Sequence, residues 1–261
     1  MTTVARWGIL VGLCAATFLA RAAESMAGTE VCGGRLEDRN HTVCLQALKN
    51  AAPAIAVPVI SRVLSSSDGA TRHTLVAGLL DILRTFGKKG APAGDTLSAM
   101  LSHRHPLYRD RDKSTVTRLR TYTLLTLSEI GVPASAVPAL LDVLAHFDAR
   151  MNPAELGATV RAAGALGLAG RRFVPYMLTA LPEAMSEDEF TLVRYEAKFE
   201  RHEATTVQLE VLRSLGHVSL PEDEEAMRTL RRLAFPESEA GADARVAREA
   251  RDAIARIGRR K

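Results

Sequence analysis

The densest group of side chains with chemical potential lies in one short segment, residues 102–112. It holds two imidazoles and two carboxylates: His103, His105, Asp110 and Asp112. Such groups ligate zinc and other divalent metals, so residues 103–112 are a candidate site for a metal-dependent enzyme. Three interleaved arginines would repel a cation: Arg104, Arg109 and Arg111. We therefore favour a solvated loop with Asp–Arg pairing and keep the metal-dependent enzyme as the alternative.

Other catalytic motifs are missing from the sequence. It has neither a Gly-x-Ser-x-Gly motif nor a phosphate-binding glycine-rich loop. Residues 87–90, a Gly-Lys-Lys-Gly segment, are explained more simply as a turn after a helix. We therefore expect a protein that is not an enzyme and that has no cofactor.

The first residues have the pattern of a signal peptide. Arg6 supplies positive charge, residues 9–20 form an apolar run, and Ala20-Arg21-Ala22 is a small-x-small cleavage site. The run is shorter than the roughly 20 residues that span a bilayer. We expect cleavage after Ala22, a periplasmic or secreted protein, and no membrane span in the mature chain. An uncleaved membrane anchor is the alternative.

The cysteines fit export. Cys14 lies in the apolar run, which leaves Cys32 and Cys44. An even number of cysteines in an exported protein favours a disulfide, with two buried free thiols as the alternative.

Net charge gives no reason to expect nucleic acid as a partner. The chain has 34 basic and 30 acidic residues, and removal of Arg6 and Arg21 leaves 32 basic residues. The remaining excess lies at the C-terminus, where we expect residues 259–261 to form a solvated basic tail.

An internal repeat organises the rest of the chain. Five apolar stretches end in a hydrophobic residue followed by glycine: 75–87, 119–131, 158–170, 204–216 and 246–258. Four residues before each glycine stand Leu83, Leu127, Leu166, Leu212 and Ile254. Directly before it stand Phe86, Ile130, Ala169, Leu215 and Ile257. Positions three apart share a helix face, so both columns should be buried, and the glycine suits a left-handed C-cap.

A second helix is expected in each repeat. Val-Pro pairs at residues 57–58, 137–138 and 174–175 open or interrupt apolar stretches, and proline is tolerated in a first helical turn. The expected helices are 57–64, 95–101, 137–147, 174–181 and 222–235. Residues 186–203 carry Glu, Arg and Lys with a period near four, and we expect them to extend the helix of residues 204–216 at its N-terminal end. We expect Asp243 to be the N-cap of the last helix, which includes residues 246–258.

This alternation resembles the HEAT repeat family. Residues 160–170 and 246–258 are the closest copies of its second helix, in which Val-Arg is followed by small residues, Leu-Gly and a final Gly. The resemblance covers residues 52–258 and implies an all-α fold, a right-handed α-solenoid of about five HEAT-like helix pairs. Residues 1–22 would be the signal peptide, 23–51 an irregular segment with the disulfide and a first helix, and 259–261 the tail.

The resemblance also implies a binding surface, because the second helices line the concave face of such solenoids. Arginines on these helices are the candidate binding residues: Arg72, Arg118, Arg120, Arg161, Arg194, Arg245 and Arg248. They would suit a protein or peptide partner with negative charge. The alternative is a solvated face balanced by Asp and Glu. HEAT-like DNA glycosylases hold DNA with aromatic residues, but the only tryptophan here is Trp7. We expect a binding scaffold, or an adaptor in which the array is a spacer.

The disulfide gives the first prediction. Mass spectrometry of non-reduced mature protein should find the peptides of Cys32 and Cys44 linked, with a stabilisation of about 3 kcal/mol for so short a loop. Complete alkylation of both thiols without a reductant would exclude the bond.

Overall fold

The computed structural model describes residues 38–146, 152–183, 190–196, 199–236 and 243–260, and the side chains of 182–203 lie outside this description. The expected signal peptide and Cys32 also lie outside the described residues. The chain divides into two compact units, Met1–Ser66 and Ser67–Lys261. Within the described residues, no helix combines the length and apolar character needed to cross a membrane.

The first unit contains two helices that pack together, α2 (Asp38–Asn50) and α3 (Pro53–Ser65). Cys44 and Leu48 of α2 are buried one turn apart, and α3 buries an apolar stripe that includes Ile60 and Leu64. Pro53 occupies the first turn of α3, whereas Pro58 lies inside the helix. The Cys32–Cys44 disulfide stays a prediction.

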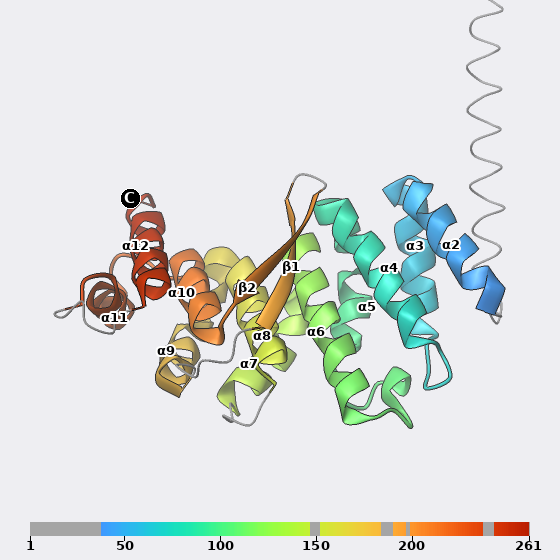
Figure 1. The fold of residues 1–261 in the computed structure, drawn as a ribbon, viewed down its shortest axis with the longest axis horizontal. Coiled ribbons are helices and arrows are strands. Elements are labelled where there is room, and N and C mark those ends of the chain that lie inside the picture. Colours follow the sequence, from blue (N-terminus) through green and yellow to red (C-terminus); the bar gives the residue numbers. More distant parts are fainter. Residues whose placement is uncertain (1–37, 147–151, 184–189, 197–198, 237–242, 261) are drawn as a thin grey trace, which may run out of the picture. The chain divides into compact units, whose positions relative to one another are not determined.

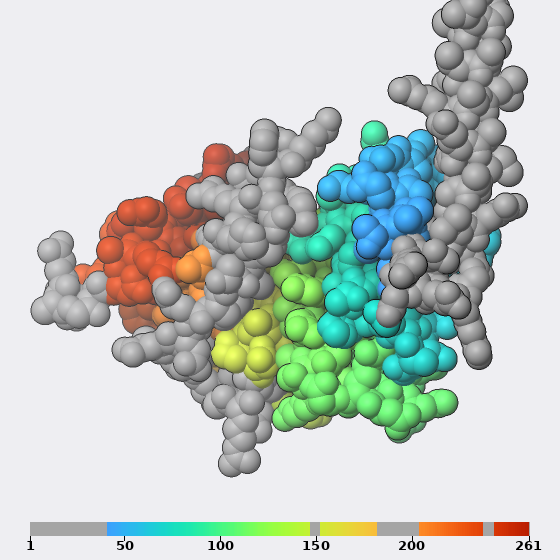
Figure 2. All heavy atoms as spheres, turned by 45° about the vertical axis from the view of Figure 1, so that its right-hand side comes forward, coloured from blue at the N-terminus to red at the C-terminus, as the bar shows by residue number. Residues whose placement is uncertain are grey.

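Five long helices form a row in the second unit, which we call the long-helix row. They are α4 (His73–Phe86), α6 (Lys113–Ile130), α8 (Pro153–Ala165), α10 (Val207–Val218) and α12 (Ala244–Gly258). Each packs against the next in the row (Figure 1). The space-filling view shows the green surface of α6 against the yellow surface of α8 (Figure 2). Each interior helix of the row therefore buries two flanks against helices of the same kind.

Shorter helices alternate with the row along the chain: α5 (Gly94–Ala99), α7 (Val137–Ala145), α9 (Val174–Glu183) and α11 (Glu224–Ala234). Each packs on a long helix: α5 on α6, α7 on α8, α9 on α10 and α11 on α12. Short 3₁₀ segments precede three of them, η1 (Gly87–Ala93), η3 (Ala134–Ala136) and η4 (Gly167–Phe173), and η2 (Pro106–Tyr108) precedes α6. The prediction of an all-α fold is correct for the bulk of the described chain.

The starts of the helices follow the sequence signals. Pro138 falls in the first turn of α7, and Pro175 follows the first residue of α9. The Asp243 carboxylate accepts a hydrogen bond from the Arg245 amide at the start of α12, so the predicted N-cap is confirmed. Asn152 and Thr206 cap α8 and α10 in the same way.

The repeat register is correct in most of the long-helix row and wrong in α8. Leu83, Leu127 and Leu212 are fully buried, but Leu166 is half-buried. Glycine C-caps with positive φ occur at Gly87 and Gly131 as expected. The C-cap of α8 is Leu166, and the positive φ falls on the next residue, Gly167, in place of Gly170. The third repeat is therefore shifted by three residues, and Ala163 takes the core position. The Gly-x-x-Gly pattern offers two possible ends, and α8 ends near the first.

The other two repeat glycines are not C-caps. Gly216 lies inside α10 and Gly258 is the last residue of α12. Ile254, aligned with the buried leucines, is half-buried. The repeat is therefore less regular at its end than the aligned sequences predict.

The expected helical extension at residues 186–203 is wrong. The structure instead has an antiparallel hairpin of β1 (Phe190–Glu196) and β2 (Phe199–Thr205), with Phe190 opposite Thr205. β1 is rich in aromatic and β-branched residues, which fit a pleated strand better than a helix. β1 packs on α8, and Thr205 is buried at the end of β2.

The burial pattern predicts unequal effects for two leucines in the same aligned column. Leu127→Ala should lower the free energy of unfolding by about 2–5 kcal/mol, because it empties a fully buried site. Leu166→Ala, the matched control, should lower it by less than about 1 kcal/mol. Urea denaturation measures both values, and equal losses would contradict the shifted register.

Candidate functional site

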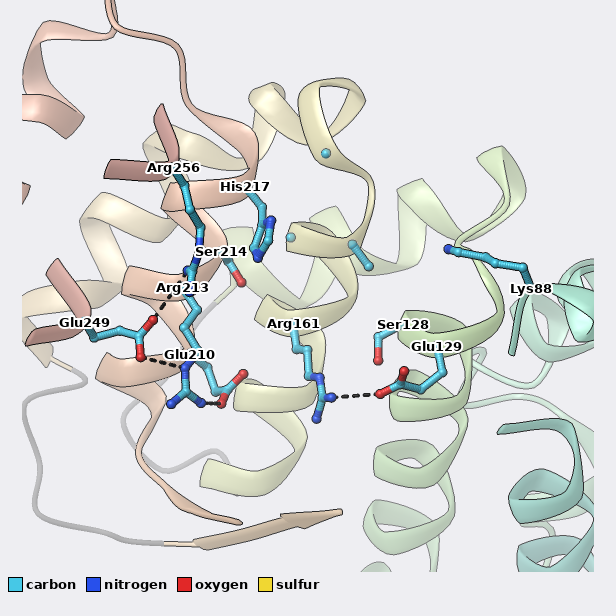
Figure 3. A pocket seen from close by; sticks show the side chains of 13 residues that line it. Lys88, Ser128, Glu129, Arg161, Glu210, Arg213, Ser214, His217, Glu249 and Arg256 are labelled. Carbon is cyan, nitrogen blue, oxygen red and sulfur yellow. Dashed lines mark hydrogen bonds and ion pairs between the residues drawn. The ribbon is translucent and has the colours of Figure 1, made fainter. Parts of the chain in front are cut away.

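A polar groove of about 580 Å³ crosses the long-helix row. Side chains from α6, α8, α10 and α12 line it, together with Lys88 of η1 (Figure 3). Its charged and hydroxyl groups are Lys88, Ser128, Glu129, Arg161, Glu210, Arg213, Ser214, His217, Glu249 and Arg256. Gly164, Ala165 and Gly167 complete the lining. The groove is thus built from four consecutive long helices and has small residues at its centre.

Small residues allow two pairs of long helices to approach closely beside the groove. A Cβ atom on Gly164 of α8 would lie 2.5 Å from Ser214 Oγ of α10, too close for any real side chain. The Ser214 hydroxyl donates a hydrogen bond to the Val160 carbonyl oxygen over 3.0 Å. A Cβ atom on Gly216 would similarly lie 2.9 Å from the Cα atom of Ala253 on α12.

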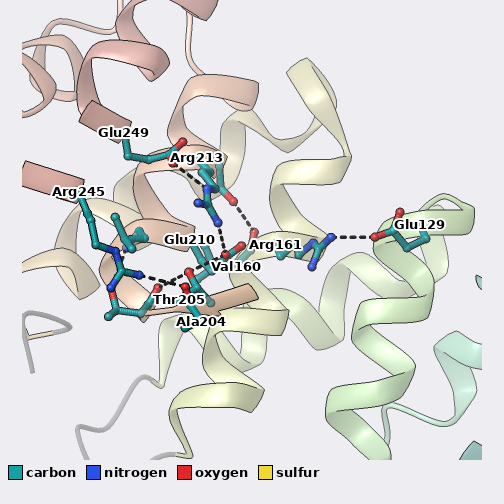
Figure 4. Close-up of polar contacts among 12 residues, drawn as sticks. Glu129, Val160, Arg161, Ala204, Thr205, Glu210, Arg213, Arg245 and Glu249 are labelled. Atoms are coloured by element: carbon teal, nitrogen blue, oxygen red, sulfur yellow. Dashed lines mark hydrogen bonds and ion pairs between the residues drawn. The ribbon is translucent and has the colours of Figure 1, made fainter. Parts of the chain in front are cut away.

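Arg213 is the centre of a charged network at one side of the groove. Its NH1 group donates to Glu210 Oε1 over 2.9 Å, and its Nε group donates to Glu249 Oε2 over 2.8 Å. Thr205 Oγ1 also donates to Glu210, over 3.0 Å, so the network reaches the end of β2 (Figure 4). Glu210 is almost completely buried. The Arg213 guanidinium therefore joins α10 to α12, while Glu210 also binds the end of β2.

A second ion pair joins α8 to α6. Arg161 NH2 donates to Glu129 Oε1 over 2.8 Å, and both side chains are mostly shielded from solvent. Like Ser214, Ser128 donates its hydroxyl to a main-chain carbonyl, that of Leu125, over 2.7 Å. In this part of the groove Arg161 therefore pairs with Glu129, and the serine hydroxyls bond to the main chain.

Positive charge is less balanced at the far end of α10. Burial lowers the pKa of His217 below its usual range, and the guanidiniums of Arg256 and Arg260 lower it further. Arg260 is fixed there by hydrogen bonds to the carbonyl oxygens of Ser219 and Gly216. Arg260 is therefore not the freely solvated tail residue that the sequence suggested.

Of the seven arginines expected on a binding face, the groove includes Arg161. Arg72, Arg118, Arg245 and Arg248 are exposed, and Arg245 donates to the Ala204 carbonyl oxygen over 3.0 Å. Arg194 lies in β1, and its side chain is outside the description. The structure therefore does not gather the predicted arginines into one site.

Arg120 was predicted to lie on the binding face, and the structure corrects this prediction. Its side chain is only 3% exposed, and its Nε group donates to Glu155 Oε1 over 2.6 Å. Its NH1 group donates to the Leu101 carbonyl oxygen. Arg120 thus joins α6 to α8 inside the fold and presents no charge to a partner.

The sequence reading missed Lys88, Arg213, His217 and Arg256. One signal was present, because Glu129, Ser214 and Arg256 each stand two residues before a repeat glycine. A polar column next to the two apolar columns marks the helix face that borders the groove. Aligning all columns of the repeat, rather than the apolar ones alone, would have found it.

The segment considered as a metal site has local structural roles. Asp112 caps α6 by accepting from the Thr115 amide over 2.9 Å, and its hydrogen bonds to Ser114 and Thr115 hold its pKa below the usual range. His105 Nδ1 accepts from the Leu107 amide over 3.2 Å. Asp110 lies in the left-handed region, with φ of 58°. Within the described chain, no three His, Cys, Asp or Glu side chains are placed to hold a metal ion.

Arg111 holds this segment in place. Its Nε group donates to the Leu107 carbonyl oxygen over 2.6 Å, and NH2 donates to the carbonyl oxygen of Thr71. The Asp–Arg pairing expected for residues 103–112 is therefore replaced at Arg111 by bonds to the main chain. These contacts do not support the metal-dependent alternative.

No protein-family model matches this chain, and no curated protein matches it. Among solved structures, an engineered protein from the Northeast Structural Genomics Consortium superposes with a TM-score of 0.53 at 15% identity, over 90% of this chain. This chain spans 58% of that protein's length. A second engineered protein from the consortium gives a TM-score of 0.49 at 16% identity, over 89% of this chain and 97% of its own. The first likeness shows a shared helical fold.

The position of Arg120 predicts the behaviour of its ion pair. Arg120→Met should lower the free energy of unfolding by about 3–5 kcal/mol, because the carboxylate of Glu155 is left in a buried site without its cation. The double variant Arg120→Met/Glu155→Leu should recover most of this loss, since it removes both charges. Chemical denaturation measures both, and a double variant no more stable than the single one would contradict a buried pair.

Proposed function

We propose that this chain is an exported HEAT-like α-solenoid that acts as a non-enzymatic binding scaffold or adaptor, with its groove as the binding site for a protein or peptide. The solenoid part is supported by the long-helix row, in which each helix packs on the next while shorter helices alternate along the chain. Repeat arrays of this kind offer long continuous surfaces for partners.

The observation that carries the proposal is the groove itself. Its lining comes from four consecutive helices of the row, so a ligand in it would contact several repeats at once. Glu129 and Arg161 bind each other across one side, and Arg213 binds Glu210 and Glu249 across the other. Ion pairs of this kind form a rigid, preorganised surface for recognition.

Export is proposed from the sequence alone. The charged, apolar and small-residue pattern of residues 1–22 and the pair of remaining cysteines both support it. A partner would then be sought among proteins of the periplasm or the extracellular medium.

Obstruction of the groove tests the binding role. Ala165 is exposed at the end of α8 and lines the groove, so Ala165→Trp should fill it without disturbing the ion pairs. Ala169→Trp is the matched control, because Ala169 is exposed on η4 and is not part of the lining. Affinity capture from envelope extracts should recover the same proteins with the wild type and with the control. The recovered amount of these proteins should fall at least about tenfold with Ala165→Trp.

Circular dichroism should show the same helix content in all three proteins. Recovery of the same partners by Ala165→Trp would contradict the groove as the binding site. Failure of the wild type to enrich any protein over bare resin would contradict the scaffold.

A further inference from the structure

Two basic side chains of the groove have no hydrogen bond or ion pair within the described chain, His217 on α10 and Lys88 on η1. They contrast with Arg161 and Arg213, which are held by carboxylates of neighbouring helices. Lys88 points toward the groove from the side opposite His217 and Arg256 (Figure 3). The groove therefore has two separate places where a negative group would find a partner.

The surroundings of His217 favour an anion. Arg256 and Arg260 are the charged groups that act on its imidazole, and both disfavour its protonation. Among the described residues, the Arg256 guanidinium has one contact, a long one of 3.4 Å to Glu249, a carboxylate that Arg213 binds more closely. A carboxylate placed beside His217 and Arg256 would relieve this repulsion.

The other elements packed on α10 bring little negative charge to this end. The charged side chains of α8 and η4 are Glu155, Arg161, Arg171 and Arg172, and those of α12 are Arg245, Arg248, Glu249, Arg251, Asp252 and Arg256. Asp252 is exposed to solvent. Glu155 is bound to Arg120, and Glu249 to Arg213. The described side chains of α9 include no charged group.

The groove's carboxylates restrict the kind of anion. Three of them line it, Glu129, Glu210 and Glu249. A uniform polyanion such as a nucleic acid or sulfated polysaccharide would place negative charges beside them along its length. A peptide can place its carboxylates opposite the cationic groups of the groove and neutral residues opposite the glutamates, which avoids that repulsion.

We propose that the groove binds an acidic peptide segment, with one carboxylate at His217 and Arg256 and another at Lys88. This inference rests on the proposed function, since it specifies the partner chemistry of the same groove. Under this proposal, the partner's carboxylates bind to basic side chains at the ends of the groove and not to the exposed arginines of the repeat.

Direct titration with a defined peptide tests the proposal. The probe is an acetylated, amidated peptide with two glutamates separated by a run of glycines, synthesised with several run lengths, and the reference peptide has glutamine at each glutamate. Lys88→Gln and Arg256→Gln should each weaken binding of the acidic peptide about fivefold to tenfold. Their matched controls are Lys89→Gln and Arg248→Gln, exposed neighbours on the same elements that do not line the groove. The controls should stay within about twofold of the wild type.

The imidazole of His217 supplies a second readout. Its NMR signal is assigned by its loss in His217→Gln, and its pKa is measured with and without peptide. A bound carboxylate stabilises the protonated ring, so the acidic peptide should raise the pKa of His217 and bind more tightly as pH falls through that range. The glutamine peptide should do neither.

Three outcomes overturn the proposal. These are equal losses for Lys88→Gln and Lys89→Gln, an unchanged pKa of His217 at saturating acidic peptide, or tighter binding of a sulfated hexasaccharide than of the peptide. If the acidic peptide fails while capture of partners still depends on Ala165, the scaffold stands and only the carboxylate chemistry falls. If capture is also independent of Ala165, both fall.

Discussion

Ser214 lies so close to Gly164 that a side chain at residue 164 would occupy the space of its hydroxyl oxygen. This contact brings α8 and α10 together in the middle of the long-helix row, and the hydroxyl donates to the Val160 carbonyl oxygen across the same interface. The groove crosses the row at this point, with Gly164 and Ser214 in its lining. A larger residue at position 164 would separate the two helices and, with them, Arg161 from the Arg213 network.

Charged side chains connect the helices of the row, in addition to its apolar core. Arg120 joins α6 to α8 from inside, Arg161 joins the same helices at the groove, and Arg213 joins α10 to α12. Buried ion pairs of this kind contribute little net stability, but they tolerate few other arrangements of the helices. Glu210 extends this effect to the hairpin, because it also accepts from Thr205 at the end of β2. One buried carboxylate thus couples the groove to the strands that interrupt the helical repeat.

The same pairing determines what the groove offers to a ligand under our proposal. Guanidiniums already bound to carboxylates present shape and hydrogen-bond donors more than net charge. The Lys88 ammonium and the His217 imidazole, which becomes protonated when a carboxylate binds beside it, would supply the charge that a partner meets. Recognition would then depend on where a partner carries its acidic groups rather than on how many it carries. A scaffold with this property distinguishes among acidic partners, which an exposed row of arginines would do poorly.

Local signals in the sequence were enough to predict most of the helices. Pro138 and Pro175 mark first turns, Asp243 marks an N-cap, and Gly87 and Gly131 mark ends, because each acts on its own backbone. Leu127 and Leu212 were predicted as core residues from periodicity alone. The end of α8 at Ala165 was not predicted, because the Gly-x-x-Gly pattern is compatible with two ends and only packing selects one.

The hairpin and the site depended on the tertiary structure. The charge pattern of residues 186–203 suits an exposed helix, yet residues 190–196 form β1, which packs on α8, a helix that ends at Ala165. The charge pattern of one segment does not reveal a contact with another segment. Arg120 and Arg161 look equivalent in sequence, but one is buried against Glu155 and the other lines the groove. The sequence by itself determined where helices begin and which faces are apolar, since those follow from neighbouring residues. Which charged side chains pair with one another was decided only when helices far apart in the chain came together.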